Sequence, residues 1–97
     1  MPTYISLVNF TDQGIRNVKS TVERAQAVKK AAEAAGGRVI GVWWTLGQHD
    51  IVLISESPDD ETATRLLLAT AMQGNVRTTT LRAFNEEEMA RIVQGLP

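Results

Sequence analysis

The sequence RVIGVWWTLGQHDIVLISE, which occupies residues 38–56, contains two strand-like runs on either side of a short turn. The runs at residues 38–46 and 49–56 are rich in β-branched and aromatic residues, which favour extended backbone. Gly47 lies between them and supplies the positive φ that a tight hairpin turn requires. We therefore predict an antiparallel hairpin in the middle of the chain.

The chain ahead of this hairpin predicts one strand and one helix. Residues 3–10 have the β-branched and aromatic content of a strand. Residues 15–35 then change to helical spacing, and Gly36 ends the helix. One side of that helix carries an apolar stripe, made of Ile15, Val18, Val22, Ala25, Val28, Ala32 and Ala35.

The chain after the hairpin predicts two more helices and a fourth strand. Residues 57–61 place a proline and three carboxylates in a first helical turn, where they suit the helix dipole, and Gly74 closes this helix. Residues 75–84 return as a strand. Residues 85–94 begin with an asparagine and a glutamate at capping-box spacing, which predicts a C-terminal helix.

The order β-α-β-β-α-β predicts an α+β, ferredoxin-like domain over residues 1–97, with an antiparallel sheet, helices on one face and a C-terminal helix. The first and third strands are apolar on both alternating sets, so we place them in the centre of the sheet. The fourth strand carries two arginines and three threonines, which suits an edge.

Composition excludes several classes of function. The 97 residues contain no cysteine, which removes disulfides, thiolate nucleophiles and Cys-ligated metals, and with one histidine we expect no metal site. The net charge of −1 is a poor footprint for nucleic acid. No signal pattern or apolar run long enough to cross a bilayer is present, so we expect a cytoplasmic protein that does not bind membranes.

The two adjacent tryptophans imply a partner. Trp43 and Trp44 must point to opposite faces of their strand, so one of them lies on the face that the helices leave uncovered. The third strand is apolar toward that face as well. Such a face exceeds what soluble monomers usually expose. We therefore predict a homodimer or higher oligomer in which a second copy packs sheet to sheet.

Five segments resemble the GYD domain family, in order and over essentially the whole chain. They are TYISLVNFTDQGIRNV (3–18), Gly37 with VWWTLG (42–47), DIV (50–52), SPDD (57–60) and GNVRT (74–78). The resemblance implies a dimeric α/β-barrel, in which two ferredoxin-like sheets face each other, and it implies no particular activity. Relatives usually carry tyrosine in a Gly-x-Tyr-Asp signature. In this chain His49 stands in its place, which puts in doubt any role that needs a phenol there.

Two sets of residues are candidates for a site. His49 and Arg82 are the candidate catalytic pair, since an imidazole is the usual general base near neutral pH. Asp50 follows His49 on a strand and points the other way, so we expect its carboxylate to cap the hairpin. Period-two spacing can gather a set of residues on the face toward a partner, namely Tyr4, Ser6, Trp43, Thr78, Thr80 and Arg82. The candidate ligand-binding residues are Tyr4, Ser6, Thr78 and Thr80 of this set together with Trp43 and Trp44, because either tryptophan could shape a pocket.

The leading functional interpretation is a homo-oligomeric domain that binds a small molecule or serves as an accessory protein. Its site would lie between sheet and helices or at the barrel interface. The alternative is a cofactor-free enzyme of oxygenase or isomerase type that uses His49 and Arg82. A further alternative is tautomerase chemistry at Pro2 after removal of Met1. For the ligand-binding set itself, the alternative is an ordinary dimer interface, and for His49 it is a surface or interface position.

Overall fold

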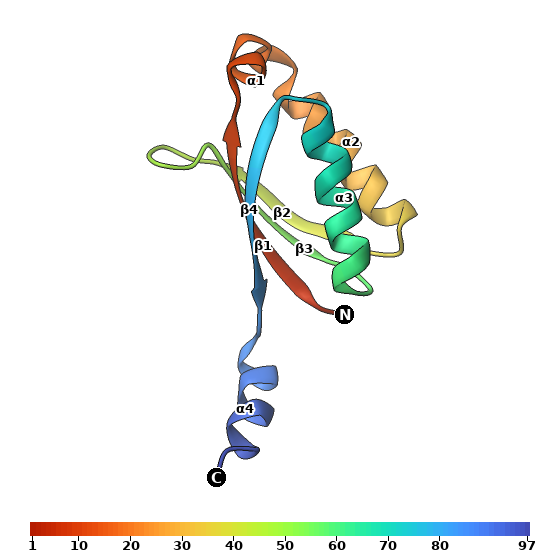
Figure 1. The fold of residues 1–97 in the computed structure, drawn as a ribbon, viewed down its shortest axis with the longest axis vertical. Helices are drawn as coiled ribbons and strands as arrows, with labels where there is room; N and C mark the ends of the chain where they lie inside the picture. Colours follow the sequence, from red (N-terminus) through yellow and green to blue (C-terminus); the bar gives the residue numbers. More distant parts are fainter.

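The computed structural model describes residues 1–97 as a four-stranded antiparallel sheet with helices (Figure 1). Its strands are β1 (Thr3–Phe10), β2 (Arg38–Trp44), β3 (Ile51–Glu56) and β4 (Val76–Ala83), in the spatial order β2-β3-β1-β4. β1 and β3 are therefore central and β2 and β4 are edges, which confirms the predicted ferredoxin-like α+β arrangement.

The two main helices, α2 (Thr21–Ala34) and α3 (Asp60–Met72), lie on the same side of the sheet (Figure 1). α3 begins slightly later than predicted, because Asp59 is its N-cap and accepts a hydrogen bond from the Thr62 N–H at 2.8 Å, which leaves Pro58 ahead of the first turn. The helices cover one face only, and the other face of the sheet has no layer upon it in this chain. No helix combines the length and the apolar character needed to span a membrane.

The C-terminal helix α4 (Glu86–Gln94) projects past the end of β4, away from the sheet and the other helices (Figure 1). Its predicted capping box is present, with the Glu88 N–H donating to Asn85 Oδ1 at 2.8 Å and the Asn85 N–H donating to Glu88 Oε1 at 3.1 Å. The bond from the Asn85 backbone lowers the pKa of the Glu88 carboxyl.

The long helix predicted over residues 15–35 is wrong in its first half. The chain instead forms α1 (Asp12–Arg16), a single 3₁₀ turn η1 (Val18–Ser20) and then α2. Asn17 leaves the helical conformation at φ −103° and ψ 27°. Its carbonyl oxygen accepts a hydrogen bond from Arg24 Nη1 at 2.9 Å. The break therefore leaves no unpaired backbone oxygen at this point.

Close packing against the start of β4 holds α1 in place. A Cβ on Gly14 would stand 1.9 Å from the Asn75 carbonyl oxygen. The Thr11 N–H donates to that oxygen at 3.1 Å, and the Thr11 hydroxyl donates to the Gly74 carbonyl oxygen at 2.5 Å. α1 is thus tied to the α3–β4 connection and does not continue along α2. As a result the first three members of the predicted apolar stripe are exposed, namely Ile15, Val18 and Val22.

The hairpin between β2 and β3 forms, but its strands are shorter than predicted and its connection is longer. Residues 45–50 make the loop, and Gly47 adopts a φ of 102° within it. The Thr45 N–H donates to the Asp50 carbonyl oxygen at 2.9 Å, and the Thr45 hydroxyl donates to the His49 carbonyl oxygen at 2.6 Å. These bonds close the loop, and residues 45–46 and 49–50 do not continue the two strands as predicted.

Strand register assigns side chains to two faces. On the face toward the helices, here the covered face, Ser6 lies between Leu53 and Thr80. On the other face, here the open face, Leu7 lies between Val52 and Thr79. The apolar side chains of the open face are Ile5, Leu7, Trp43, Val52, Ile54 and Leu81.

The two tryptophans divide between these faces as predicted. Trp43 pairs with Val52 on the open face, where its indole lies over Gly41 and fills the place of a side chain there. Trp44 is turned to the helix side, where its Nε1–H donates to Thr21 Oγ1 at 3.1 Å.

Candidate functional site: a cavity between helices and sheet

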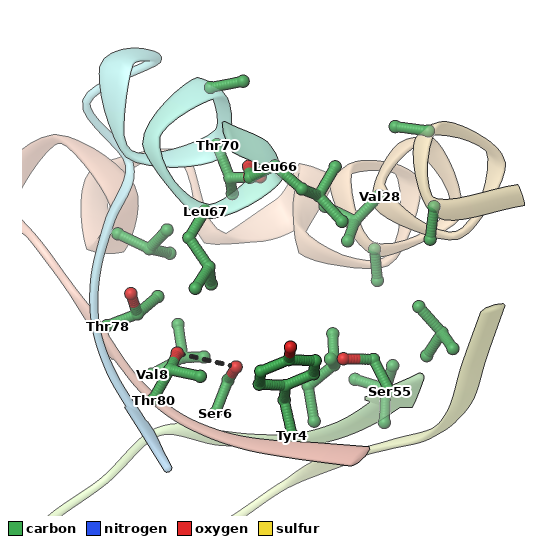
Figure 2. Close-up of a pocket in the computed structure, with 18 of the residues that line it drawn as sticks. Tyr4, Ser6, Val8, Val28, Ser55, Leu66, Leu67, Thr70, Thr78 and Thr80 are labelled. Atoms are coloured by element: carbon green, nitrogen blue, oxygen red, sulfur yellow. Dashed lines mark hydrogen bonds between the residues drawn. The ribbon is translucent and has the colours of Figure 1, made fainter. Parts of the chain in front are cut away.

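A cavity of about 180 Å³ lies between the covered face and the two main helices (Figure 2). Its floor consists of strand residues that include Tyr4, Ser6, Val8, Ser55, Thr78 and Thr80. Its roof consists of helix residues that include Val28, Leu66, Leu67 and Thr70. Leu67 points from α3 down toward the floor, so the cavity lies within the layer where a core would be expected.

Alanines in the helices leave this space unfilled. α2 turns mainly alanines toward the sheet, and α3 adds two more; the lining alanines of the two helices are Ala25, Ala27, Ala31, Ala32, Ala63 and Ala69. A methyl group reaches too short a distance to fill the gap between a helix and a sheet. The cluster of buried apolar residues is correspondingly small and comprises Val8, Ile51 and Val76. The domain is packed near the end of β1 and hollow in its middle.

Hydroxyl groups line the floor, where an apolar set is usual for a covered sheet face. Ser6 is only 3% exposed, and its Oγ lies 3.0 Å from Thr80 Oγ1 on the neighbouring strand. One of these hydroxyls donates to the other, so the pair keeps one hydrogen and several lone pairs free. Thr78 and Ser55 place two further hydroxyl side chains on the same floor (Figure 2).

Tyr4 brings a phenol to the floor and a link to α3. Its ring is 5% exposed, and its hydroxyl donates to Asp60 Oδ1 in the first turn of that helix. Burial raises the pKa of Tyr4 to about 12, and the bond to Asp60 acts in the same direction. The phenol therefore keeps its proton at neutral pH and serves as a hydrogen-bonding group, not as a base.

The predicted ligand-binding set is partly assembled, on a different face from the one expected. Tyr4, Ser6, Thr78 and Thr80 do lie together, but under the helices and not toward a partner subunit. Alternation along a strand shows which residues share a face; it does not show which face the helices take. Trp43 and Trp44 lie outside the cavity lining.

Arg82 connects β4 to the C-terminal helix. Its Nη2 lies 3.6 Å from Glu88 Oε2, and its guanidinium carbon lies 4.5 Å from the centre of the Phe84 ring. The same carbon lies 6.0 Å from the centre of the Tyr4 ring. These contacts give Arg82 a role in orienting α4 relative to the sheet.

His49 lies at the far end of β1 from Arg82. Its Nδ1 is 2.8 Å from Asn9 Oδ1, whereas Arg82 is the register partner of Tyr4. Five residues of strand separate those two positions, or about 17 Å at the usual rise. A single protomer therefore does not bring the predicted catalytic pair together.

The carboxylate of Asp50 binds the backbone of β1 and not the hairpin that it was predicted to cap. Its Oδ2 accepts a hydrogen bond from the Phe10 N–H at 2.8 Å, and its own N–H donates to the Val8 carbonyl oxygen at 2.9 Å. The carboxylate thus ties the loop to the end of β1. It does so without orienting the imidazole of His49, which is held by Asn9.

Pro2 lies in a shallow polar groove at the Arg82 end of β1. Arg82, Glu88 and Arg91 also line this groove. The Pro2 carbonyl oxygen accepts a hydrogen bond from the Ser57 N–H at 3.1 Å, so this segment is anchored to the start of the β3–α3 connection.

Sequence reasoning missed two contributors to the cavity. Ser55 on β3 is the register partner of Tyr4 on β1. The alternation of side chains along β3 already placed Ser55 on one face with Leu53 and Ile51. Asp60 fits the pattern of a first-turn carboxylate that suits the helix dipole, and that pattern alone explains its presence in the sequence. The contact between Asp60 and Tyr4 joins residues that are far apart in the chain, so no local sequence pattern predicts it.

Comparison with known proteins agrees with this architecture. Residues 4–93 match the GYD domain family. The chain belongs to that family. A relative of the GYD domain from Thermus thermophilus is named glutamine synthetase and cystathionine beta-lyase binding protein. It is 37% identical over 85 residues, which cover 87% of this chain and 90% of the relative.

Two solved structures share the fold of this GYD domain. The crystal structure of MtbAldR superposes with a TM-score of 0.68 at 15% identity; the match covers 88% of this chain and 52% of that one, so the GYD domain spans about half of MtbAldR. The crystal structure of TTHA0845 from Thermus thermophilus gives a TM-score of 0.55 at 24% identity, over 88% of this chain and 95% of that one. At these identities the likeness shows the fold alone.

Proposed function

We propose that this GYD domain is a homo-oligomeric accessory protein that binds a small molecule in the cavity between its helices and its sheet. The observation that carries the proposal is the cavity itself, about 180 Å³ of space with a largely apolar lining and a group of hydroxyls on its floor. Ligand sites typically combine apolar walls with a few converging polar groups. A domain that needed only stability would fill this space with larger side chains.

The homo-oligomeric part rests on the open face. Trp43 is 52% exposed and Leu81 is 49% exposed, and four more aliphatic side chains lie on the same face. Covering several hundred Å² of apolar surface contributes on the order of 10 kcal/mol before the cost of association. A second copy packed sheet to sheet covers this face in the way the family resemblance implies.

The accessory part is supported by the relative from Thermus thermophilus, whose name describes it as a binding protein for two enzymes. We propose the same kind of role here, with another protein as partner and the bound small molecule as a signal between them. The alternative is a cofactor-free enzyme that uses His49 and Arg82. It has less support, because these residues lie at opposite ends of β1.

Native mass spectrometry tests the site, with two adjacent leucines of α3 as a matched pair. Leu67 lines the cavity, whereas Leu68 is 61% exposed on the outside of the same helix. We expect gently purified protein to carry reproducible extra mass, Leu67→Trp to lose it, and Leu68→Trp to keep it. All three chains should keep the same subunit number.

Two results would overturn the proposal. Extra mass retained by Leu67→Trp would place the ligand elsewhere. If the purified protein carries no extra mass, a mixture of small molecules is added and the same pair compared. Failure of every compound to bind more strongly to the wild-type chain than to Leu67→Trp would then show that the cavity is not a ligand site.

A further inference from the structure

The size of the cavity limits the ligand. A cavity of about 150 Å³ with apolar walls holds one benzene molecule. The cavity in this domain measures about 180 Å³, so it accepts a molecule of about that size with one or two additional atoms. Larger metabolites such as nucleotides do not fit within it.

The charged residues of the lining already make polar contacts within the chain. They are Arg24 and Glu56. Arg24 Nη1 donates to the Asn17 carbonyl oxygen and to Ser20 Oγ, each at 2.9 Å, so both hydrogens of this nitrogen are in use. Glu56 Oε1 lies 2.5 Å from Arg38 Nε. Glu56 thus has a counter-charge in the chain, whereas Arg24 is held by neutral acceptors.

The remaining ionisable group on the floor is neutral. Tyr4 keeps its proton because its pKa is raised to about 12. Its hydroxyl hydrogen is committed to the Asp60 carboxylate. A cationic ligand would therefore lose its hydration in this cavity without a free carboxylate to pair with, and an anion would have to draw Arg24 away from its existing hydrogen bonds. In both cases the lost hydration is costly.

The hydroxyls of the floor and the roof differ in whether they are already bonded: Thr70 on the roof donates to the Leu66 carbonyl oxygen at 2.9 Å. The Ser6–Thr80 pair has a hydroxyl hydrogen and lone pairs free, and it faces a roof formed by Val28, Leu66 and Leu67 (Figure 2). A ligand that satisfies both sides has an apolar body under the helices and a hydrogen-bonding group toward the strands.

We infer that the ligand is a small, uncharged molecule about the size of a single ring, with one hydroxyl or carbonyl group that bonds to Ser6 and Thr80. The inference rests on the proposed function, since it names the class of molecule for the same cavity. It separates such compounds from amino acids, carboxylates, phosphates and amines, all of which carry charge at neutral pH.

Four ring compounds of similar size test the inference on the intact wild-type oligomer at pH 7. The probes are phenol, benzene, benzoate and benzylamine. Dissociation constants come from titrations followed by methyl NMR signals of Thr78 and Thr80. We expect phenol to bind at least tenfold more tightly than benzoate and protonated benzylamine, and about fivefold more tightly than benzene, as one hydrogen bond allows.

Two variants of the same type locate the hydrogen bond. Thr80→Val keeps the shape of the side chain and removes its hydroxyl, so we expect phenol to lose its advantage over benzene. Thr79→Val makes the same change on the open face and should leave binding of both probes unchanged. Leu67→Trp should abolish binding of both.

The outcomes separate the two proposals. If benzoate or benzylamine binds to the cavity as tightly as phenol, the inferred class is wrong while the cavity remains a ligand site. If phenol keeps its advantage in Thr80→Val, the assigned hydrogen bond is wrong. If no probe shifts the signals of Thr78 and Thr80, or if binding survives Leu67→Trp, the cavity itself fails as a site.

Discussion

Both faces of this sheet carry many apolar side chains, although helices cover only one of them. The covered face adds a group of hydroxyls to its apolar residues, with Ser6 only 3% exposed beside Thr80. The open face has no layer upon it and carries aliphatic residues and a tryptophan, with Leu7 at its centre. In most antiparallel sheets of this kind the covered face is apolar and the open face is polar.

Two features depart from the usual pattern: the open face is apolar, and the covered face includes hydroxyls. If a second copy covers the apolar open face, that face is removed from water and contributes most of the association energy. Hydroxyls under a helical layer weaken a core, and their retention is reasonable where a ligand meets them. We therefore propose that the open face serves assembly and the covered face serves recognition.

The largest expected effect comes from placing a charge on the open face. Leu7→Glu puts a carboxylate between Val52 and Thr79, where an opposing sheet would bury it. An uncompensated buried charge costs about 3–5 kcal/mol, so we expect association to weaken at least a hundredfold and the protein to become monomeric. Light scattering after size-exclusion chromatography gives the mass, and circular dichroism verifies the fold.

Leu68→Glu is the matched control for this variant. It makes the same substitution at a leucine that is 61% exposed on the outside of α3. Its mass should equal that of the wild-type protein. An oligomer that persists in Leu7→Glu would show that the open face is not the interface. Assembly could then no longer be attributed to that face.

The next effect concerns the phenol on the covered face. Tyr4 is the only tyrosine in the chain, so the absorbance of tyrosinate reports on this group alone. We expect its titration in the folded protein to have a midpoint near pH 12, because burial and Asp60 raise its pKa to about 12. In urea-unfolded protein the midpoint should be near the ordinary value of about 10.

This difference has a consequence for stability. The unfolded chain loses the proton at a lower pH than the folded chain, so ionisation favours unfolding. The contribution of Tyr4 is complete below pH 10 and is lost as the pH rises toward 12. Urea unfolding of Tyr4→Phe should lack this part of the pH dependence. If the free energy of unfolding changed with pH equally in the wild-type chain and in Tyr4→Phe between pH 10 and 12, the buried position of the phenol would be contradicted.

Sequence was sufficient for the order of the strands and insufficient for their surroundings. Apolar residues on both alternating sets placed β1 and β3 in the centre, and the spacing of Asn85 and Glu88 identified the capping box of α4. These signals are local. The covered face could not be identified, because alternation groups Tyr4 with Ser6 equally well on either side of a sheet.

The two other differences also arise from contacts between distant segments. α1 is separate from α2, and Gly14 in α1 packs against the backbone of Asn75. The helical spacing of apolar residues does not predict that contact. The cavity arises from small side chains such as Ala32 on the helix that faces the sheet. Alanine predicts a helix well, yet it does not show whether the space beside it is filled.

A smaller effect is expected for the hydroxyl pair of the covered face. Ser6→Ala and Thr80→Val each remove one partner of the 3.0 Å hydrogen bond. We expect each to lower the free energy of unfolding by about 1 kcal/mol, and the double variant to lose less than the sum. Chemical denaturation of the four chains measures the coupling. Strictly additive changes would show that the two hydroxyls do not interact.

The smallest effect is expected at His49, which lies in the loop beyond the end of β1 and outside the cavity lining. His49→Ala removes a hydrogen bond to Asn9 that is partly exposed, so the free energy of unfolding should fall by no more than about 1 kcal/mol. Oligomeric mass and phenol binding should stay at wild-type values. His49→Asn, which keeps a donor near Asn9, is the control for the lost bond. A His49→Ala chain that loses phenol binding but keeps its stability would place the imidazole in the site, and recognition could then no longer be assigned to the covered face alone.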